Sequence, residues 1–260
     1  MPDSIKLGPR LNCLANLVGF KTRLADIGTD HAYLPIALCE QGKIERAIAI
    51  ELHQGPYQTA LAAVQHRRLT NQIELRPGNG LQPLRPGEVD TLTLAGMGGK
   101  TILEILFARP DILAEISDLL VQPQGLEAKV RSDLLDAGWL LREEHLVEEG
   151  RVYVIMAFSR KAGYSKQEIL ELEELWIQRI RSASEMINKD TEILDSLFWR
   201  LGPLLLQFPN PLLQRLIQEH RAELTFREQQ MQKSRSCSVQ QRRQEVLREL
   251  DFLEVITRLD

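Results

Sequence analysis

The stretch from Leu24 to Pro35, which reads Leu-Ala-Asp-Ile-Gly-Thr-Asp-His-Ala-Tyr-Leu-Pro, constrains the fold of this chain more than any other. An apolar run over 22–27 ends at Gly28, and a helix is predicted to begin near Tyr33. A short strand that passes through a glycine turn into a helix is typical of the first strand of an open α/β sheet. Ligands bind such sheets at the carboxyl ends of the strands. A binding loop is therefore expected at Gly28, whose missing Cβ lets a ligand approach the backbone.

The charge of this loop indicates the kind of ligand. A dinucleotide fingerprint needs glycine at its first, third and sixth positions, where this chain has Gly28, Asp30 and Tyr33. The Asp30 carboxylate would repel a pyrophosphate and attract a sulfonium or an ammonium group. The loop therefore favours S-adenosylmethionine (SAM) over NAD or ATP. An ordinary tight turn in an α/β domain is the alternative.

The next two predicted strands end in polar residues. A second strand over 46–50 ends in Glu51, whose carboxylate can accept hydrogen bonds from two ribose hydroxyls. A third strand over 73–76 runs into a turn that contains Asn79 and Gly80. Asn79 could hydrogen-bond the edge of an adenine. The alternatives are a surface glutamate that closes a strand and a common Asn-Gly turn.

A glycine-rich segment follows the fourth predicted strand, 89–94. It reads Ala-Gly-Met-Gly-Gly over 95–99 and precedes a helix over 100–107. Three glycines in four positions indicate that the backbone closely approaches another group. We expect Gly96, Met97 and Gly98 to form the wall between a cofactor and its acceptor, with a packing turn as the alternative.

The remaining strands indicate the class of sheet. A fifth strand over 119–122 ends in Gln122 and is followed by Gln124, and the segments 139–147 and 151–158 form a predicted hairpin with Gly150 at the turn. A mainly parallel, Rossmann-like sheet that closes with an antiparallel hairpin is the α/β sheet of class I SAM-dependent methyltransferases. The predicted helix 9–18 precedes this sheet. Its Arg10 could face the site, although we favour its interpretation as a solvated side chain.

Composition narrows the remaining possibilities. The net charge of −4 excludes a strongly basic nucleic-acid footprint, so any contact with RNA requires a local patch. The three cysteines have no metal-type spacing, and no metal is expected. The chain shows neither a signal peptide nor a transmembrane run, which predicts a cytoplasmic protein without membrane contact.

The pattern changes near residue 160, which divides a predicted SAM-binding domain, 1–160, from a helical domain, 161–260. Apolar residues at helical spacing predict one long helix over 169–194 and another over 212–256, paired antiparallel as a coiled coil. The most basic stretch of the chain lies in this domain, where it either contacts phosphates or forms a solvated helix face; it contains Arg227, Lys233, Arg235, Arg242 and Arg243.

Five sequence blocks together resemble the bacterial tRNA (adenine-22-N1)-methyltransferases, the TrmK family. They are 26–35, Glu51 with 55–57, 78–81, 95–99 and Gln122-Pro123. The resemblance implies a class I methyltransferase domain with a C-terminal coiled coil, SAM as cofactor and tRNA as partner. It also implies a site in which Asp26, Gly28 and Asp30 hold the methionine part of SAM, Glu51 the ribose and Asn79 the adenine. The family often has an acid where Asn79 stands, and Gln-Pro-Asn where this chain has Gln-Pro-Gln over 122–124.

The activity implied by the resemblance is methyl transfer to N1 of adenine 22 in tRNA. Adenine N1 has an in-plane lone pair, so alignment of the reactants is expected to do most of the catalytic work, and no catalytic dyad is predicted. His31 could assist, although a lone histidine in a turn is more often structural. The alternatives are a small-molecule methyltransferase on the same fold and a non-catalytic SAM-binding scaffold protein, while Asp30 and Tyr33 disfavour an NAD enzyme.

Overall fold

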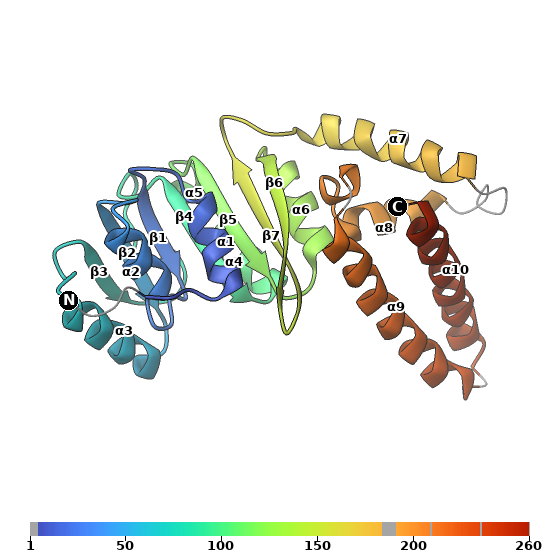
Figure 1. The fold of residues 1–260 in the computed structure, drawn as a ribbon, viewed down its shortest axis with the longest axis horizontal. Helices are drawn as coiled ribbons and strands as arrows, with labels where there is room; N and C mark the ends of the chain where they lie inside the picture. Colours follow the sequence, from blue (N-terminus) through green and yellow to red (C-terminus); the bar gives the residue numbers. More distant parts are fainter. Residues whose placement is uncertain (1–4, 184–190, 209, 235, 260) are drawn as a thin grey trace. The chain divides into compact units, whose positions relative to one another are not determined.

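The computed structural model describes residues 5–183, 191–208, 210–234 and 236–259 (Figure 1). The chain forms two compact units that divide in sequence after Ser165, a few residues beyond the expected division at 160. Each unit is described by itself below.

The first unit is built on a seven-stranded sheet with the order β3-β2-β1-β4-β5-β7-β6. Strands β1 to β5 are parallel, and β7 is antiparallel to both β5 and β6, so the predicted sheet of a class I methyltransferase is confirmed. The strand order reverses between β1 and β4, which is where ligands of open α/β sheets bind. The strands are β1 (Arg23–Ile27), β2 (Arg46–Glu51), β3 (Ile73–Pro77), β4 (Thr91–Met97), β5 (Asp118–Pro123), β6 (Leu140–Glu149) and β7 (Arg151–Ser159).

Burial explains why these short apolar runs form central strands. Leu24, Ala25 and Ile27 of β1 are each at most 2% exposed, because helices pack along the sheet (Figure 1). Helices α1, α2 and α3 bury Leu14, Leu38 and other side chains in a core shared with β2 and β3, while α4 packs on α5, α6, β4 and β5. The helices are α1 (Pro9–Leu17), α2 (Tyr33–Glu40), α3 (Gln54–His66), α4 (Gly99–Phe107), α5 (Pro110–Leu113) and α6 (Glu127–Asp136).

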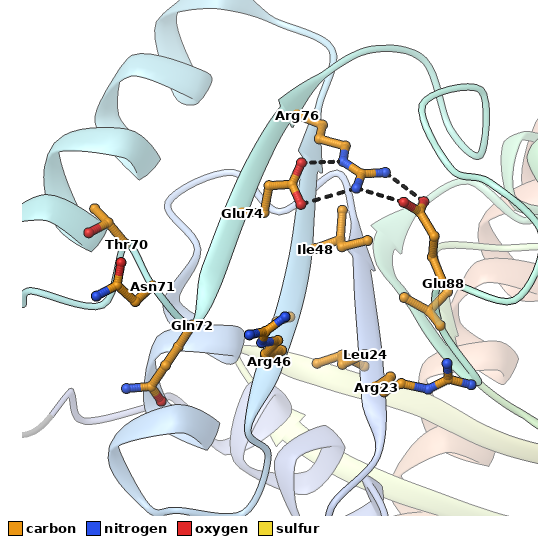
Figure 2. Close-up of a pocket in the computed structure, with 12 residues that line it drawn as sticks. Arg23, Leu24, Arg46, Ile48, Thr70, Asn71, Gln72, Glu74, Arg76 and Glu88 are labelled. Atoms are coloured by element: carbon orange, nitrogen blue, oxygen red, sulfur yellow. Dashed lines mark hydrogen bonds and ion pairs between the residues drawn. The ribbon is translucent and has the colours of Figure 1, made fainter.

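A groove opens at the starts of the strands because residues 78–90 join β3 to β4 without a helix. Figure 2 shows Arg76 in this groove between Glu74 and Glu88. Its Nε donates to Glu74 Oε1 at 2.8 Å and its Nη1 to Glu88 Oε2 at 2.7 Å, so the charge is compensated within the groove. The groove is also lined by Arg46, the first residue of β2. It therefore lies away from the carboxyl ends of the strands, where the site is predicted.

The second unit is helical, and its described part contains no strand. Its elements are α7 (Lys166–Ala183), α8 (Thr191–Leu201), the 3₁₀ helix η2 (Leu205–Gln207), α9 (Pro211–Gln232) and α10 (Cys237–Leu259). The predicted long helix over 169–194 includes residues outside the described ranges. Our interpretation of 212–256 as one helix is wrong, because the chain turns back after Lys233 and two shorter helices pair.

The pairing of α9 with α10 is antiparallel. Arg243 Nε donates to Glu228 Oε1 at 2.7 Å near the turn, and Nε2 of His220 lies 2.9 Å from Glu249 Oε1 farther along the helices. The helical hairpin is therefore formed by α9 and α10, and not by the two long helices that we predicted over 169–194 and 212–256. Over the ranges that the structure describes, no helix is both long and apolar enough to span a membrane.

Candidate functional site

The loop after β1 folds back onto the end of β2. The backbone N–H groups of Gly28 and Thr29 both donate to the Ile50 carbonyl, at 2.8 and 3.0 Å. Gly28 has a φ of +68°, and a Cβ there would overlap Met97 Cε. The positive φ therefore favours glycine at this position, whereas the flexible end of Met97 could move away from a Cβ. The loop leads directly into α2 at Tyr33.

Asp26 fixes the loop to two strands. Its Oδ2 accepts a 2.6 Å hydrogen bond from Thr29 Oγ1, and its Oδ1 accepts one of equal length from Thr93 Oγ1 of β4. Burial raises the pKa of Asp26, and the two hydroxyl groups oppose that shift. Thr93 was not predicted as a site residue from the sequence. A hydroxyl residue between Leu92 and Leu94 of a buried strand could have indicated it.

Glu51 is the second fixed carboxylate. It is only 6% exposed, and each of its oxygens accepts one backbone hydrogen bond. Oε2 accepts from the Asp30 N–H at 3.1 Å and Oε1 from the His53 N–H at 2.9 Å. A carboxylate has about four acceptor positions, so acceptor capacity remains for two hydroxyl groups of a ligand. The end of β2 and the loop after β1 therefore form one hydrogen-bonded unit.

The glycine-rich segment forms a bulge at the end of β4. Ala95 pairs with Gln122, whereas Met97 pairs with Pro123, and Gly96 between them has a φ of +78°. The Gly96 N–H donates to Gln122 Oε1 at 3.1 Å. Gln122 is fully buried, so its amide holds the bulge in place and has no access to a ligand. Bulges of this kind direct a side chain at strand ends beside active sites.

These elements enclose a hollow of about 310 Å³ at the carboxyl ends of β1 and β4. This volume lies at the lower end of the roughly 300–1,000 Å³ of small-molecule sites. Most of the predicted site residues line it together, namely Asp26, Gly28, Asp30, His31, Gly96 and Met97, with Gln124 and Tyr33 beside them. Gly98 does not line it; it precedes α4 as the N-cap residue.

Arg10 also lines this hollow, so our interpretation of it as a solvated side chain is wrong. It reaches the site because α1 packs on β6 and β7, a long-range contact that no local pattern indicates. Its Nη1 lies 3.1 Å from where a Cβ on Gly96 would be, at the edge of the bulge.

Asn79 and Gly80 line a separate, smaller hollow with Thr101, Ile105 and other residues. A hydrogen bond of 3.0 Å from the Gly78 N–H to the Glu51 carbonyl joins their turn to the end of β2. The structure therefore places Asn79 near the strand that carries Glu51 but outside the hollow that contains Gly28.

His31 lies in the wall of the larger hollow. Its ring stacks on that of Tyr33 with centroids 5.2 Å apart, and its Nε2 lies 3.6 Å from Asp30 Oδ2. Its Nδ1 is buried and has no hydrogen-bond partner among the described residues. Within the described ranges no cluster of three or more His, Cys, Asp or Glu side chains could hold a metal ion.

Residues 7–156 match the family described as Methyltransferase domain. The tRNA (adenine(22)-N(1))-methyltransferase of Bacillus subtilis (strain 168) is 36% identical to this chain over 166 residues, which cover 62% of this chain and 70% of the relative.

Solved structures of similar proteins match both units. The structure of the B. subtilis M1A22 tRNA methyltransferase TrmK matches with a TM-score of 0.77 at 26% identity. The match covers 97% of this chain and 99% of the TrmK chain. TrmK of M. capricolum in complex with S-adenosyl-homocysteine has a TM-score of 0.70 at 26% identity and covers 95% and 99%. A Streptococcus pneumoniae protein in complex with SAM has a TM-score of 0.75 at 29% identity and covers 97% and 100%. With these matches over a site of the expected geometry, the chain belongs to the family of tRNA (adenine-22-N1)-methyltransferases.

Proposed function

We propose that this protein transfers a methyl group from SAM to N1 of adenine 22 in tRNA. The observation that carries the proposal is the joined arrangement of Gly28, Asp30 and Glu51, in which the glycine loop after β1 is hydrogen-bonded to the end of β2 and to its buried carboxylate, beside the switch point of the sheet. The proposal keeps the cytoplasmic location expected from the sequence, because its substrate is tRNA.

The residues of the hollow, with Glu51 at the end of β2 bonded to Asp30, fit SAM by charge. Asp26 and Asp30 provide negative potential for the sulfonium and ammonium groups, and Gly28 gives the loop after β1 its positive φ beside the methionine part. Glu51 has acceptor capacity left for the two ribose hydroxyls. Asn79, with Gly80, takes the adenine of the cofactor in the neighbouring hollow. SAM, when bound, supplies a methyl group that is activated by the adjacent sulfonium.

The bulge at Gly96 forms the part of the site that faces the adenine that accepts the methyl group. Met97 presents a flexible apolar side chain that can pack on the face of a flat base, and Gly98 keeps the start of α4 free of a side chain. Adenine N1 needs no prior deprotonation, so alignment accounts for most of the rate enhancement. His31 lines the hollow and can contact the bound molecules without acting as an essential base.

The proposed function is tested by methylation of unmodified tRNA with labelled SAM, followed by mapping of the modified base. We expect 1-methyladenine at position 22, and no product on tRNA with guanine at that position. Glu51→Ala should weaken SAM binding by at least about tenfold, because hydrogen bonds to a charged acceptor are lost. Glu45→Ala, an exposed acid before β2, is the matched control and should leave SAM binding unchanged.

The outcome separates the alternatives. Methylation of a small molecule but not of tRNA would favour a small-molecule methyltransferase. SAM binding without transfer to any RNA would favour a scaffold protein. Unchanged SAM affinity in Glu51→Ala would remove the assignment of the ribose position.

We also propose that the turn between α9 and α10 contacts the tRNA. Arg227, Lys233 and Arg242 are exposed near this turn, whereas Arg243 is bonded to Glu228. Arg235 lies outside the described residues. Exposed basic side chains gathered at one end of a hairpin can neutralise several phosphates.

The contact is tested with the double variant Lys233→Ala/Arg242→Ala. The slope of log affinity for tRNA against log salt should fall by about 1–2, and SAM affinity should not change. Arg215→Ala, an exposed arginine at the other end of α9, is the control. A slope equal to that of the unaltered protein would show that the turn does not contact RNA.

A further inference from the structure

The hollow that contains Gly28 has a single permanently charged cation among the described residues that line it. That cation is Arg10, and the acids Asp26 and Asp30 line the same space. Its side chain is 24% exposed, so its guanidinium is largely withdrawn from bulk water. A bound molecule therefore meets one fixed positive charge and at least one fixed negative charge.

The protein holds Arg10 firmly in this position. Its Nη1 donates to Gln122 Oε1 at 2.8 Å and its Nε to Glu149 Oε2 at 3.2 Å, while its guanidinium lies 5.5 Å from the centre of the Tyr153 ring. These partners come from β5, β6 and β7. An arginine held on several sides has lost most of its conformational freedom before a ligand arrives, which lowers the entropic cost of binding.

Arg10 keeps donors for a ligand. A guanidinium has five N–H donors, and the two hydrogen bonds to Gln122 and Glu149 use two of them. The other three have no hydrogen-bond acceptor among the residues that the structure describes. Two parallel N–H groups of a guanidinium match the two oxygens of a carboxylate.

We propose that Arg10 binds the methionine carboxylate of SAM. This inference rests on the proposed function and adds a contact at the same site. The amino-acid end of SAM is a zwitterion, so it needs a cation for its carboxylate and acids for its ammonium group. The hollow offers both, since Arg10, Asp26 and Asp30 all line it.

A phosphate of the tRNA backbone is the competing ligand for Arg10. One feature favours the carboxylate. The guanidinium lies over Gly96 and lines the same hollow as Gly28, where the amino-acid end of SAM is proposed to bind.

The proposal is tested by calorimetry with SAM and with decarboxylated SAM, which keeps the sulfonium and the amine and lacks only the carboxylate. In the unaltered protein SAM should bind about tenfold to a hundredfold more tightly than the decarboxylated compound. In Arg10→Met the two compounds should bind with nearly equal affinity, because the only group that distinguishes them has lost its partner.

The ratio of the two affinities separates a direct contact from a structural role. If Arg10 only holds Gln122 and the bulge, Arg10→Met weakens both compounds equally and the ratio stays as in the unaltered protein, which overturns the proposal. Unchanged SAM affinity together with a raised KM for tRNA also overturns it and assigns Arg10 to the RNA. Arg151→Met, which removes the other arginine that lies over the Tyr153 ring, should leave the ratio unchanged.

Failure of SAM as the cofactor gives a different result, because neither compound then binds the unaltered protein and no ratio can be measured. Failure of methyl transfer to tRNA alone, with SAM still bound, appears in the tRNA methylation assay and leaves the ratio of affinities in the unaltered protein unchanged. A ratio that is preserved in Arg10→Met, with tight SAM binding, overturns only the role of Arg10.

Discussion

The two units of the chain differ in how one buried acid of each is compensated. In the first unit Arg131 and Glu144, both with fully buried side chains, lie 2.5 Å apart as an ion pair, and Asp26 accepts two hydroxyl hydrogen bonds. In the helical unit Glu173 of α7 is 7% exposed, and its Oε1 has no hydrogen-bond partner among the described residues. Burial, with the nearby Asp195 carboxylate, raises the pKa of Glu173 to about 7.

This difference relates to function. The unit that builds the site has to hold loops to within a fraction of an ångström, and compensated polar contacts between strands do so. The helical unit carries an acid that is more stable neutral, so its stability is expected to depend on pH in a range where that of the first unit changes little. Three predictions test this contrast, from the largest effect to the smallest.

The largest effect is expected from Arg131→Met. The substitution leaves the Glu144 carboxylate buried without its cation, which costs about 3–5 kcal/mol of unfolding free energy. Urea unfolding measures the loss of unfolding free energy, and hydrogen exchange of the β6 amides shows whether it affects this strand. The double variant Arg131→Met/Glu144→Leu removes both charges and should recover most of the stability. If the double variant is as unstable as the single one, packing rather than the unpaired charge is responsible.

The second effect is the pH dependence of the helical unit. The pKa of Glu173 is raised in the folded state from 4.5 to about 7, so the folded state binds more protons than the unfolded state between these values. Stability from this group is therefore present below about pH 4.5 and is lost as pH rises through 7.

Glu173→Gln removes the titration and should raise the stability of α7 at pH 8 by up to about 3 kcal/mol, with little change at pH 4.5. Hydrogen exchange of the α7 amides at both pH values measures the effect. Glu174→Gln, the exposed neighbour on the same helix, is the control. An equal gain at both pH values would contradict a titrating Glu173.

The smallest effect is expected from Thr93→Val in the site. The substitution keeps the shape of the side chain and removes one hydroxyl donor from Asp26, which should cost about 1 kcal/mol. The loop around Gly28 should loosen, so SAM affinity is expected to fall severalfold by calorimetry. Thr59→Val, on the exposed side of α3, is the control. Unchanged SAM affinity with reduced stability would show that Thr93 supports the fold but not the loop.

The strands and most helices of the first unit were predictable because their signals are local. The run over 22–27, the glycine turn at Gly28 and the hairpin around Gly150 were each expected from a few adjacent residues, and all three are present. The four-residue α5 was not predicted, since a single helical turn leaves no periodic pattern. Our prediction of the pairing in the helical unit was wrong, because helical periodicity does not indicate where a long amphipathic segment folds back.

The sequence by itself determined where the strands of the first unit end and which residues stand there, including Gly28, Glu51 and the glycines around Met97. Only the tertiary structure decided which distant groups complete the site. Arg10 reaches the bulge from α1, and Thr93 reaches Asp26 from β4, although these two residues are 67 positions apart in the sequence. Local propensity depends on neighbours along the chain, whereas these contacts depend on how strands and helices pack, so no short-range pattern could contain them.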